Sequence, residues 1–126
     1  MRRGCLTGFF LVLFTCCRFV YAVQDPEEIL RAVVGIRATI PEDARTAQAL
    51  GTEREGHGVL IDSDGHILTI GYLILEADTI EITGPDDEII KGIVVGYDHN
   101  SGFGLVRTDP PLHVQPLELG QSSDVE

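Results

Sequence analysis

Short runs of β-branched and aliphatic residues, each closed by a turn sequence, constrain the fold of this chain most strongly. DSDG at 62–65 and PDDE at 85–88 separate neighbouring runs, and DPP at 109–111 ends the last. Short strands with turns between them at regular spacing are typical of antiparallel sandwiches and barrels. The sequence therefore predicts an all-β fold, with strands at 32–40, on both sides of 62–65, and at 78–84, 89–98 and 103–108.

Other local signals complete the expected elements. Asp25 can cap a short helix that begins at Pro26. The polar stretch 41–56 is expected to be a surface loop, and Gly92 and Gly96 are candidate β-bulges. Strand alternation and buried runs predict a core formed by Val34, Ile36, Val59, Ile61, Ile67, Leu68, Ile80, Ile82, Ile93, Val95, Leu105 and Val106.

The N-terminus has the layout of a secretory signal peptide over residues 1–22. Arg2 and Arg3 precede an apolar run at 8–17, and small residues precede a cleavage site after Ala22. The run is shorter than the roughly 20 apolar residues that span a bilayer, and an uncleaved anchor is the alternative. All three cysteines lie in this segment, so residues 23–126 offer no disulfide or thiol chemistry.

The charge of the chain excludes several partners. The formal net charge is −11, and residues 23–126 keep six basic residues against 20 acidic ones. Nucleic acids and anionic membranes are bound by clustered Lys and Arg. We therefore expect no nucleic-acid partner and no membrane contact beyond the signal peptide.

The stretch DHNSGFG at 98–104 raises the question of a nucleophilic serine. A nucleophile loop places glycine two residues before the serine, so that backbone N–H groups can face an oxyanion. His99 occupies that position relative to Ser101, and Phe103 stands two residues after it. Ser101 is therefore not expected to be a nucleophile.

No metal or cofactor is predicted from the remaining polar residues. His57, His66, His99 and His113 fall in separate predicted turns or loops, without the spacing of a zinc site. DSDG at 62–65 is similar to the start of a calcium loop, but the later ligands are missing, which favours a hairpin turn.

Several motifs in order resemble the trypsin-like serine proteases of the HtrA/Deg type, from about residue 26 to 126. GHG at 56–58 and DSDG at 62–65 match a Gly-Ser-Gly segment and an Asp-x-x-Gly hairpin. ILTIGYLI at 67–74 matches Ile-Leu-Thr-Asn-x-His-Val-Val. IVVGYD at 93–98 and PPLHVQPLELGQSSDVE at 110–126 match the strand before the catalytic Asp segment and the linker to a second barrel.

The resemblance places Tyr72 in the position of the catalytic His and Gly102 in that of the catalytic Asp. The run at 98–107 follows the pattern Asp-x-x-Ser-Asp-Leu-Ala-Leu-Leu-Lys, with agreement at Asp98, Ser101 and Leu105. The separation of Tyr72 and Gly102 is the one that the family uses between its His and Asp. A phenol is a poor proton acceptor near neutral pH, and glycine cannot orient an imidazole. The resemblance thus implies no catalytic residue here and two vacated positions.

The resemblance implies the N-terminal Greek-key β-barrel half of a two-barrel fold, over residues 23–126, with the serine-bearing second barrel expected to be absent. It leaves two hypotheses: a periplasmic or secreted, inactive homologue that acts as a binding or scaffold module, or a serine endopeptidase represented by a truncated fragment. It also implies no cofactor. An apolar barrel face would then be exposed, so we expect the chain either to be marginally stable or to pair with itself or with a protein or peptide partner. We expect the C-terminal PLELG at 116–120 to fray.

Overall fold

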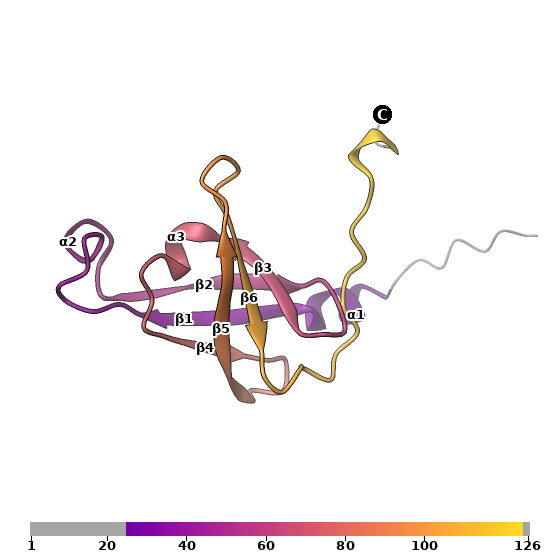
Figure 1. Ribbon diagram of the computed structural model, residues 1–126. Helices are drawn as coiled ribbons and strands as arrows, with labels where there is room; N and C mark the ends of the chain where they lie inside the picture. The colour runs from indigo at the N-terminus through magenta and orange to yellow at the C-terminus, as the bar shows by residue number, and fades with distance from the viewer. Residues whose placement is uncertain (1–24, 125–126) are drawn as a thin grey trace, which may run out of the picture.

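The structure is a computed structural model and describes residues 25–124 (Figure 1). Six antiparallel strands close into one barrel in the order β1-β2-β3-β6-β5-β4. This confirms the predicted all-β barrel. The strands are β1 (Val33–Thr39), β2 (Glu53–Leu60), β3 (His66–Ile70), β4 (Thr79–Thr83), β5 (Ile89–Tyr97) and β6 (Phe103–Thr108).

Alternation along the strands builds the core inside the barrel. β1 shows the pattern most clearly, because Val34, Ile36 and Ala38 are buried while the residues between them are not. A β-strand turns successive side chains to opposite faces, so this strand presents one apolar face to the interior. Of the predicted core, the fully buried members are Val34, Ile36, Ile67, Ile80, Ile82 and Val106.

The core prediction is wrong for the second half of β5. Ile93 and Val95 are exposed. β5 pairs with β4 only from Ile89 to Gly92, and its register with β6 shifts between Val94 and Gly96. The bulge therefore lies beside Gly96, as predicted, and breaks the alternation that an apolar sequence suggests. Val59, Ile61, Leu68 and Leu105 are only half-buried.

Gly92 is a site of close packing and not a bulge. A Cβ at this position would lie 2.7 Å from Ile80 Cγ2 and 2.9 Å from Val106 Cγ1. The prediction of a bulge here is wrong, because the missing side chain makes room for neighbouring core residues.

The short helices lie at the ends of the barrel. α1 (Pro26–Arg31) begins as predicted, with the Asp25 carboxylate accepting a hydrogen bond from Glu27 N at 3.1 Å. α2 (Ala47–Leu50) lies within the stretch 41–56, and β2 already begins at Glu53, so the predicted loop is too long. A 3₁₀ turn, η1 (Ser122–Asp124), ends the described chain.

α3 (Gly71–Ile74) follows β3 directly and closes one end of the barrel. Leu73 and Ile74 are buried. A Cβ on Gly104 would lie 2.6 Å from Ile74 Cδ1, and one on Gly56 would lie 2.5 Å from Leu73 Cδ1. The two glycines leave room for these side chains, and the barrel core thereby fixes α3 in place.

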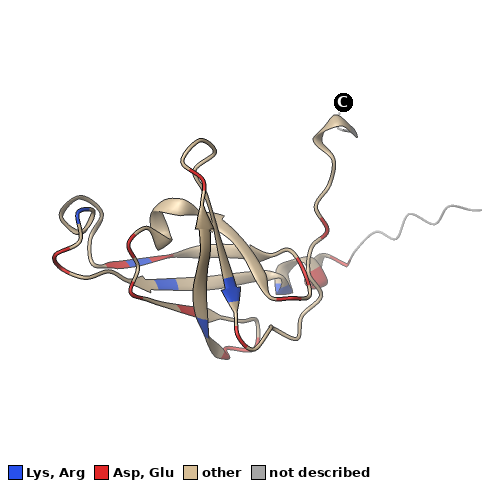
Figure 2. Cartoon of the chain, viewed as in Figure 1, with Lys and Arg blue, Asp and Glu red and all other residues tan. Residues whose placement is uncertain are grey.

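The segment after β6 runs back along the barrel. Leu112 is buried, and Leu117 N donates to Leu60 O at 2.9 Å. The expected fraying of 116–120 therefore does not apply to Leu117, whereas Leu119 is exposed. Acidic residues lie mainly in the loops and at strand ends (Figure 2). Among residues 25–124, no helix is long and apolar enough to cross a membrane.

Candidate functional site

The fold joins the two segments that carry Tyr72 and Gly102. Gly71 N donates to Gly102 O at 2.7 Å, which ties the start of α3 to the loop between β5 and β6. Figure 1 shows α3 beside this hairpin. A side chain on Gly71 would collide with the ring of Tyr97 and would lie 3.0 Å from Gly102 O. Only glycine allows this close approach, so the residue before Tyr72 helps to set the geometry of the site.

The β5–β6 loop is organised by the carboxylate of Asp98. This carboxylate accepts hydrogen bonds from Ser101 Oγ at 2.6 Å, and from Asn100 N and Ser101 N at 3.2 Å each. The Ser101 hydroxyl and the two backbone groups lower the pKa of Asp98 below its ordinary value, because all three favour the charged form. Asp98 is therefore a structural acceptor in the turn.

Ser101 is engaged in this turn and not in a nucleophile–base pair. Its hydroxyl donates to Asp98 and accepts from Phe103 N at 3.3 Å. No histidine is hydrogen-bonded to it among the described residues. An activated serine requires a base within hydrogen-bond distance.

Gly102 closes the turn in a left-handed conformation, with φ of 76°. Its N–H donates to Asp98 O at 2.9 Å. No atom lies within 4 Å of a Cβ placed there. The position has room for a larger side chain, and Asp and Asn are the non-glycine residues that best tolerate this backbone region.

Tyr72 presents its side chain to solvent and its backbone to a buried cation. Its side chain is exposed, between the buried Gly71 and Leu73. Its carbonyl accepts from Arg54 Nη1 at 2.6 Å. A phenol at this position can contact a partner or donate a hydrogen bond, but it cannot act as the neutral-pH base of a hydrolase.

Sequence reasoning missed Arg54 and Glu76. Arg54 donates hydrogen bonds to carbonyls in and directly after α3, and Glu76 binds Thr46 from the segment that follows α3. Arg54 is 4% exposed and donates to the carbonyls of Gly51, Tyr72 and Leu75 and to Thr46 Oγ1. A signal for Arg54 was present in the alternation of β2, where it shares the inward face with Gly58 and Leu60. No sequence pattern distinguishes Glu76 from a solvated acid.

The four histidines do not come together. His57 lies in β2 and His66 begins β3, so the expectation that both lie in turns or loops is wrong. His99 stacks edge-on against Tyr97 with ring centroids 4.5 Å apart, and His113 is exposed. His66 alone among them has a carboxylate partner in the described chain.

The predicted hairpin turn at 62–65 is present and brings three donor groups together. Asp62 accepts from Asp64 N and His66 N, and His66 Nδ1 lies 2.7 Å from Asp62 Oδ2. Desolvation acts to raise the pKa of Asp62, but the hydrogen bonds from His66 outweigh it, and the pKa lies below its ordinary value. Donor atoms of Asp62, Asp64 and His66 lie within 4.8 Å of one another. The turn's own hydrogen bonds already account for this arrangement.

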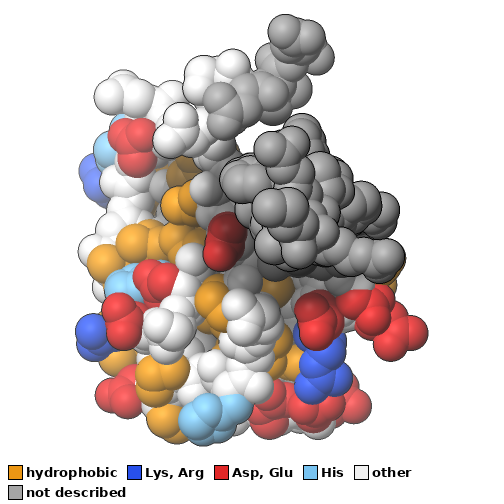
Figure 3. All heavy atoms as spheres, turned by 90° about the vertical axis from the view of Figure 1, so that its right-hand side faces the viewer, with side chains coloured by type: hydrophobic (Ala, Val, Ile, Leu, Met, Phe, Trp, Pro, Cys, Tyr) orange, Lys and Arg blue, Asp and Glu red, His pale blue; other side chains and the backbone are white. Residues whose placement is uncertain are grey.

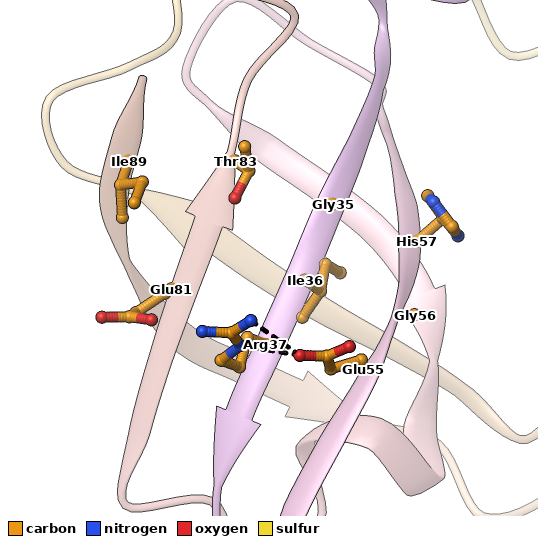
Figure 4. Close-up of a pocket in the computed structure, with 9 residues that line it drawn as sticks. All are labelled: Gly35, Ile36, Arg37, Glu55, Gly56, His57, Glu81, Thr83 and Ile89. Carbon is orange, nitrogen blue, oxygen red and sulfur yellow. Dashed lines mark hydrogen bonds and ion pairs between the residues drawn. The ribbon is translucent and has the colours of Figure 1, made fainter. Parts of the chain in front are cut away.

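A groove of about 490 Å³ lies on the outer surface of β1, β2 and β4 (Figure 4). Gly35 lines it, and Arg37 crosses it to Glu55, with Nε and Oε1 2.8 Å apart. Because Arg37 is already paired, the groove has no free cation to attract an anion. The remaining lining residues are Ile36, Gly56, His57, Glu81, Thr83 and Ile89.

An apolar surface adjoins the candidate site on β3, α3, β5 and β6. Ile70 and Phe103 are cross-strand partners and both are about half exposed. We use the name apolar surface for the exposed apolar side chains of these four elements, which are Ile70, Tyr72, Ile93, Val94, Val95 and Phe103. Figure 3 shows one side of the molecule, where hydrophobic side chains reach the exterior between acidic ones. Exposed apolar side chains that form a contiguous patch are typical of contact surfaces.

Comparisons with known proteins identify the family. The model of the trypsin-like peptidase domain matches residues 56–126. The chain belongs to the trypsin-like peptidase family. The matched region begins in β2 and includes α3 and the β5–β6 loop, so the candidate site lies within it.

Curated members of the trypsin-like peptidase family place the chain with HtrA-type proteins. "Protease Do-like 1, chloroplastic" of Arabidopsis thaliana is 30% identical over 68% of this chain and 20% of its own length. "Probable periplasmic serine endoprotease DegP-like" of Pseudomonas fluorescens is 34% identical over 65% of this chain and 16% of its own length. The chain thus spans about a fifth or less of the relatives that it matches.

A solved structure confirms the trypsin-like fold of the barrel. An HtrA-type protease with a tripeptide superimposes with a TM-score of 0.65 at 19% identity, over 79% of this chain and 30% of that one. The chain therefore forms an HtrA-type, serine-protease-like domain that corresponds to the N-terminal barrel portion of the fold.

Proposed function

We propose that this chain is an exported HtrA-type homologue that does not cleave peptide bonds and acts as a binding or scaffold module. The observation that carries the proposal is the juxtaposition of Tyr72 and Gly102 through the Gly71–Gly102 hydrogen bond. Serine-protease catalysis needs an imidazole to accept the serine proton and a carboxylate to orient that imidazole. The two residues here supply neither group.

A serine-directed probe tests this proposal. We expect no stoichiometric labelling of the chain by a fluorophosphonate and no cleavage of an unfolded protein substrate. The double variant Tyr72→His, Gly102→Asp should also remain unlabelled, because the Ser101 hydroxyl is bound to Asp98. Stoichiometric labelling of the unmodified chain would falsify the proposal.

A serine endopeptidase remains the second candidate, because the matched relatives are named proteases. In that case the chain represents a part of a longer enzyme. Labelling that depends on residues outside 1–126 and survives Tyr72→Phe would favour this candidate.

Export is proposed from the N-terminal pattern and from the relatives. Residues 1–22, the predicted signal peptide, lie outside the described residues, and the DegP-like relatives are named periplasmic. N-terminal sequencing of the chain recovered from a secreting host should begin at Val23. Recovery of the intact N-terminus in the membrane fraction would instead indicate an uncleaved anchor.

The proposed partner is a polypeptide that covers the apolar surface. The described site contains no basic cluster that would attract nucleic acid, and the chain has a net charge of −11. Burial of Phe103 and its neighbours would supply the association energy.

A further inference from the structure

Arg54 is a buried cation whose partners are neutral groups. Its side chain lies on the inward face of β2 and is 4% exposed. Nη1 donates to Tyr72 O at 2.6 Å and to Leu75 O at 3.0 Å, while Nε donates to Gly51 O at 3.3 Å. No carboxylate forms an ion pair with it in the described chain. A buried guanidinium is tolerated only when its donors are satisfied, so Arg54 and the carbonyls of α3 depend on each other.

Thr46 links this cation to the loop at 41–52. Its hydroxyl accepts from Arg54 Nη2 at 2.8 Å and donates to Glu76 Oε2 at 2.7 Å. The Glu76 carboxylate also accepts from Thr46 N at 2.8 Å and from Arg45 N at 3.3 Å. One hydroxyl therefore joins the loop, the inward face of β2 and Glu76, the second residue after α3.

Glu76 is held in an unfavourable backbone conformation. Its φ is 61°, a region that non-glycine side chains rarely adopt. Such strain persists only where neighbouring contacts hold it. Here the contacts are the three donors from Arg45 and Thr46. Without them, the backbone after α3 has a lower-energy alternative with negative φ.

We propose that Thr46, Arg54 and Glu76 form a relay that couples the conformation of the loop at 41–52 to that of α3. A ligand or a cleavage that moves the loop withdraws the Thr46 hydroxyl, releases Glu76 and loosens the segment that carries Tyr72. The barrel itself stays intact, because its strands are paired independently of this network. This coupling is a property of the fold and goes beyond the proposed binding function.

The variant Thr46→Val tests the relay, because it removes the hydroxyl at nearly constant shape. Thr52→Val is the matched control: Thr52 lies in the same loop, and its hydroxyl has no hydrogen bond in the described structure. The readout is amide hydrogen exchange in the full chain. Leu75 N and Ala77 N, which bond to Gly71 O and Ile74 O, report on α3. Amides of the paired strands β1 and β4 report on the barrel.

We expect the exchange of Leu75 and Ala77 to accelerate roughly tenfold or more in Thr46→Val, because the variant loses both hydrogen bonds of the hydroxyl, to Arg54 and to Glu76. The strand amides and the Thr52→Val control should not change. Glu76→Gln, which weakens the acceptor but keeps its shape, should give a smaller effect in the same direction. Equal acceleration of α3 and the barrel, or no acceleration at α3, would overturn the proposal.

Discussion

At the scale of single residues, Gly71 and Arg54 set the geometry of the candidate site. Gly71 permits the contact between α3 and the β5–β6 loop, because any Cβ there meets the Tyr97 ring. Arg54 holds α3 in place by donating hydrogen bonds to the carbonyls of Tyr72 and Leu75. The geometry around Tyr72 therefore rests on one absent side chain and one buried cation.

Gly71→Ala is expected to destabilise the chain by about 1–3 kcal/mol, since the added methyl group must displace the Tyr97 ring or the backbone of Gly102. Gly96→Ala is the control, because a Cβ on Gly96 meets no atom within 4 Å. Urea unfolding of both variants measures the difference. Equal stability of the two would show that α3 can shift without cost.

Arg54→Met is expected to lower the free energy of unfolding by about 2–4 kcal/mol, because it leaves buried carbonyls without donors. Arg37→Met removes an exposed ion pair with Glu55 and should cost less than about 1 kcal/mol. Thermal unfolding of the two variants provides the comparison. A loss at Arg54 no larger than at Arg37 would contradict the role assigned to burial.

At the scale of elements, the β5–β6 loop is a turn organised by the carboxylate of Asp98. Asp98 binds three donors of its own loop, and Gly102 supplies the left-handed residue that returns the chain to β6. The loop is thus held by its own hydrogen bonds and by the bond from Gly71 N to Gly102 O. Its stability should depend on the charge of Asp98.

Ser101→Ala is expected to raise the pKa of Asp98 toward its ordinary value, because the strongest donor to the carboxylate is removed. In the unmodified chain the folded pKa is depressed. The stabilising contribution of Asp98 is therefore complete above the ordinary value of 3.8 and is lost as the pH falls below it through the folded pKa. Carboxyl ¹³C titration by NMR measures both values. An unchanged pKa in Ser101→Ala would contradict this assignment.

At the scale of the whole molecule, a closed barrel carries an exposed apolar surface beside an acidic exterior. β5 loses its β4 neighbour beyond Gly92, which leaves Ile93, Val94 and Val95 at the surface. The remaining strands bury their apolar faces in the barrel. Association through the apolar surface would bury these exposed side chains.

The full chain is expected to self-associate as its concentration rises, and Phe103→Lys should shift it toward the monomer. Ile89→Lys is the control, because Ile89 is also exposed but lines the groove and is not part of the apolar surface. Sedimentation velocity over a hundredfold range of concentration gives the measurement. A strict monomer with a sharp, cooperative thermal transition would show that the apolar surface needs no partner.

Local sequence determined the strands, the turns and the cap of α1, because alternation, turn residues and capping groups act over a few neighbouring positions. The motif order also predicted the family, and the resemblance assigned Tyr72 to the position of the catalytic His and Gly102 to that of the catalytic Asp. Tertiary structure alone decided that the two segments touch, since the Gly71–Gly102 hydrogen bond joins parts of the chain that are distant in sequence. It also decided the exposure of Ile93 and Val95 and the burial of Arg54. The exposure of Ile93 and Val95 depends on where β4 stops pairing with β5, and the burial of Arg54 depends on the loop at 41–52 that covers it. Neither can be predicted from a local sequence pattern.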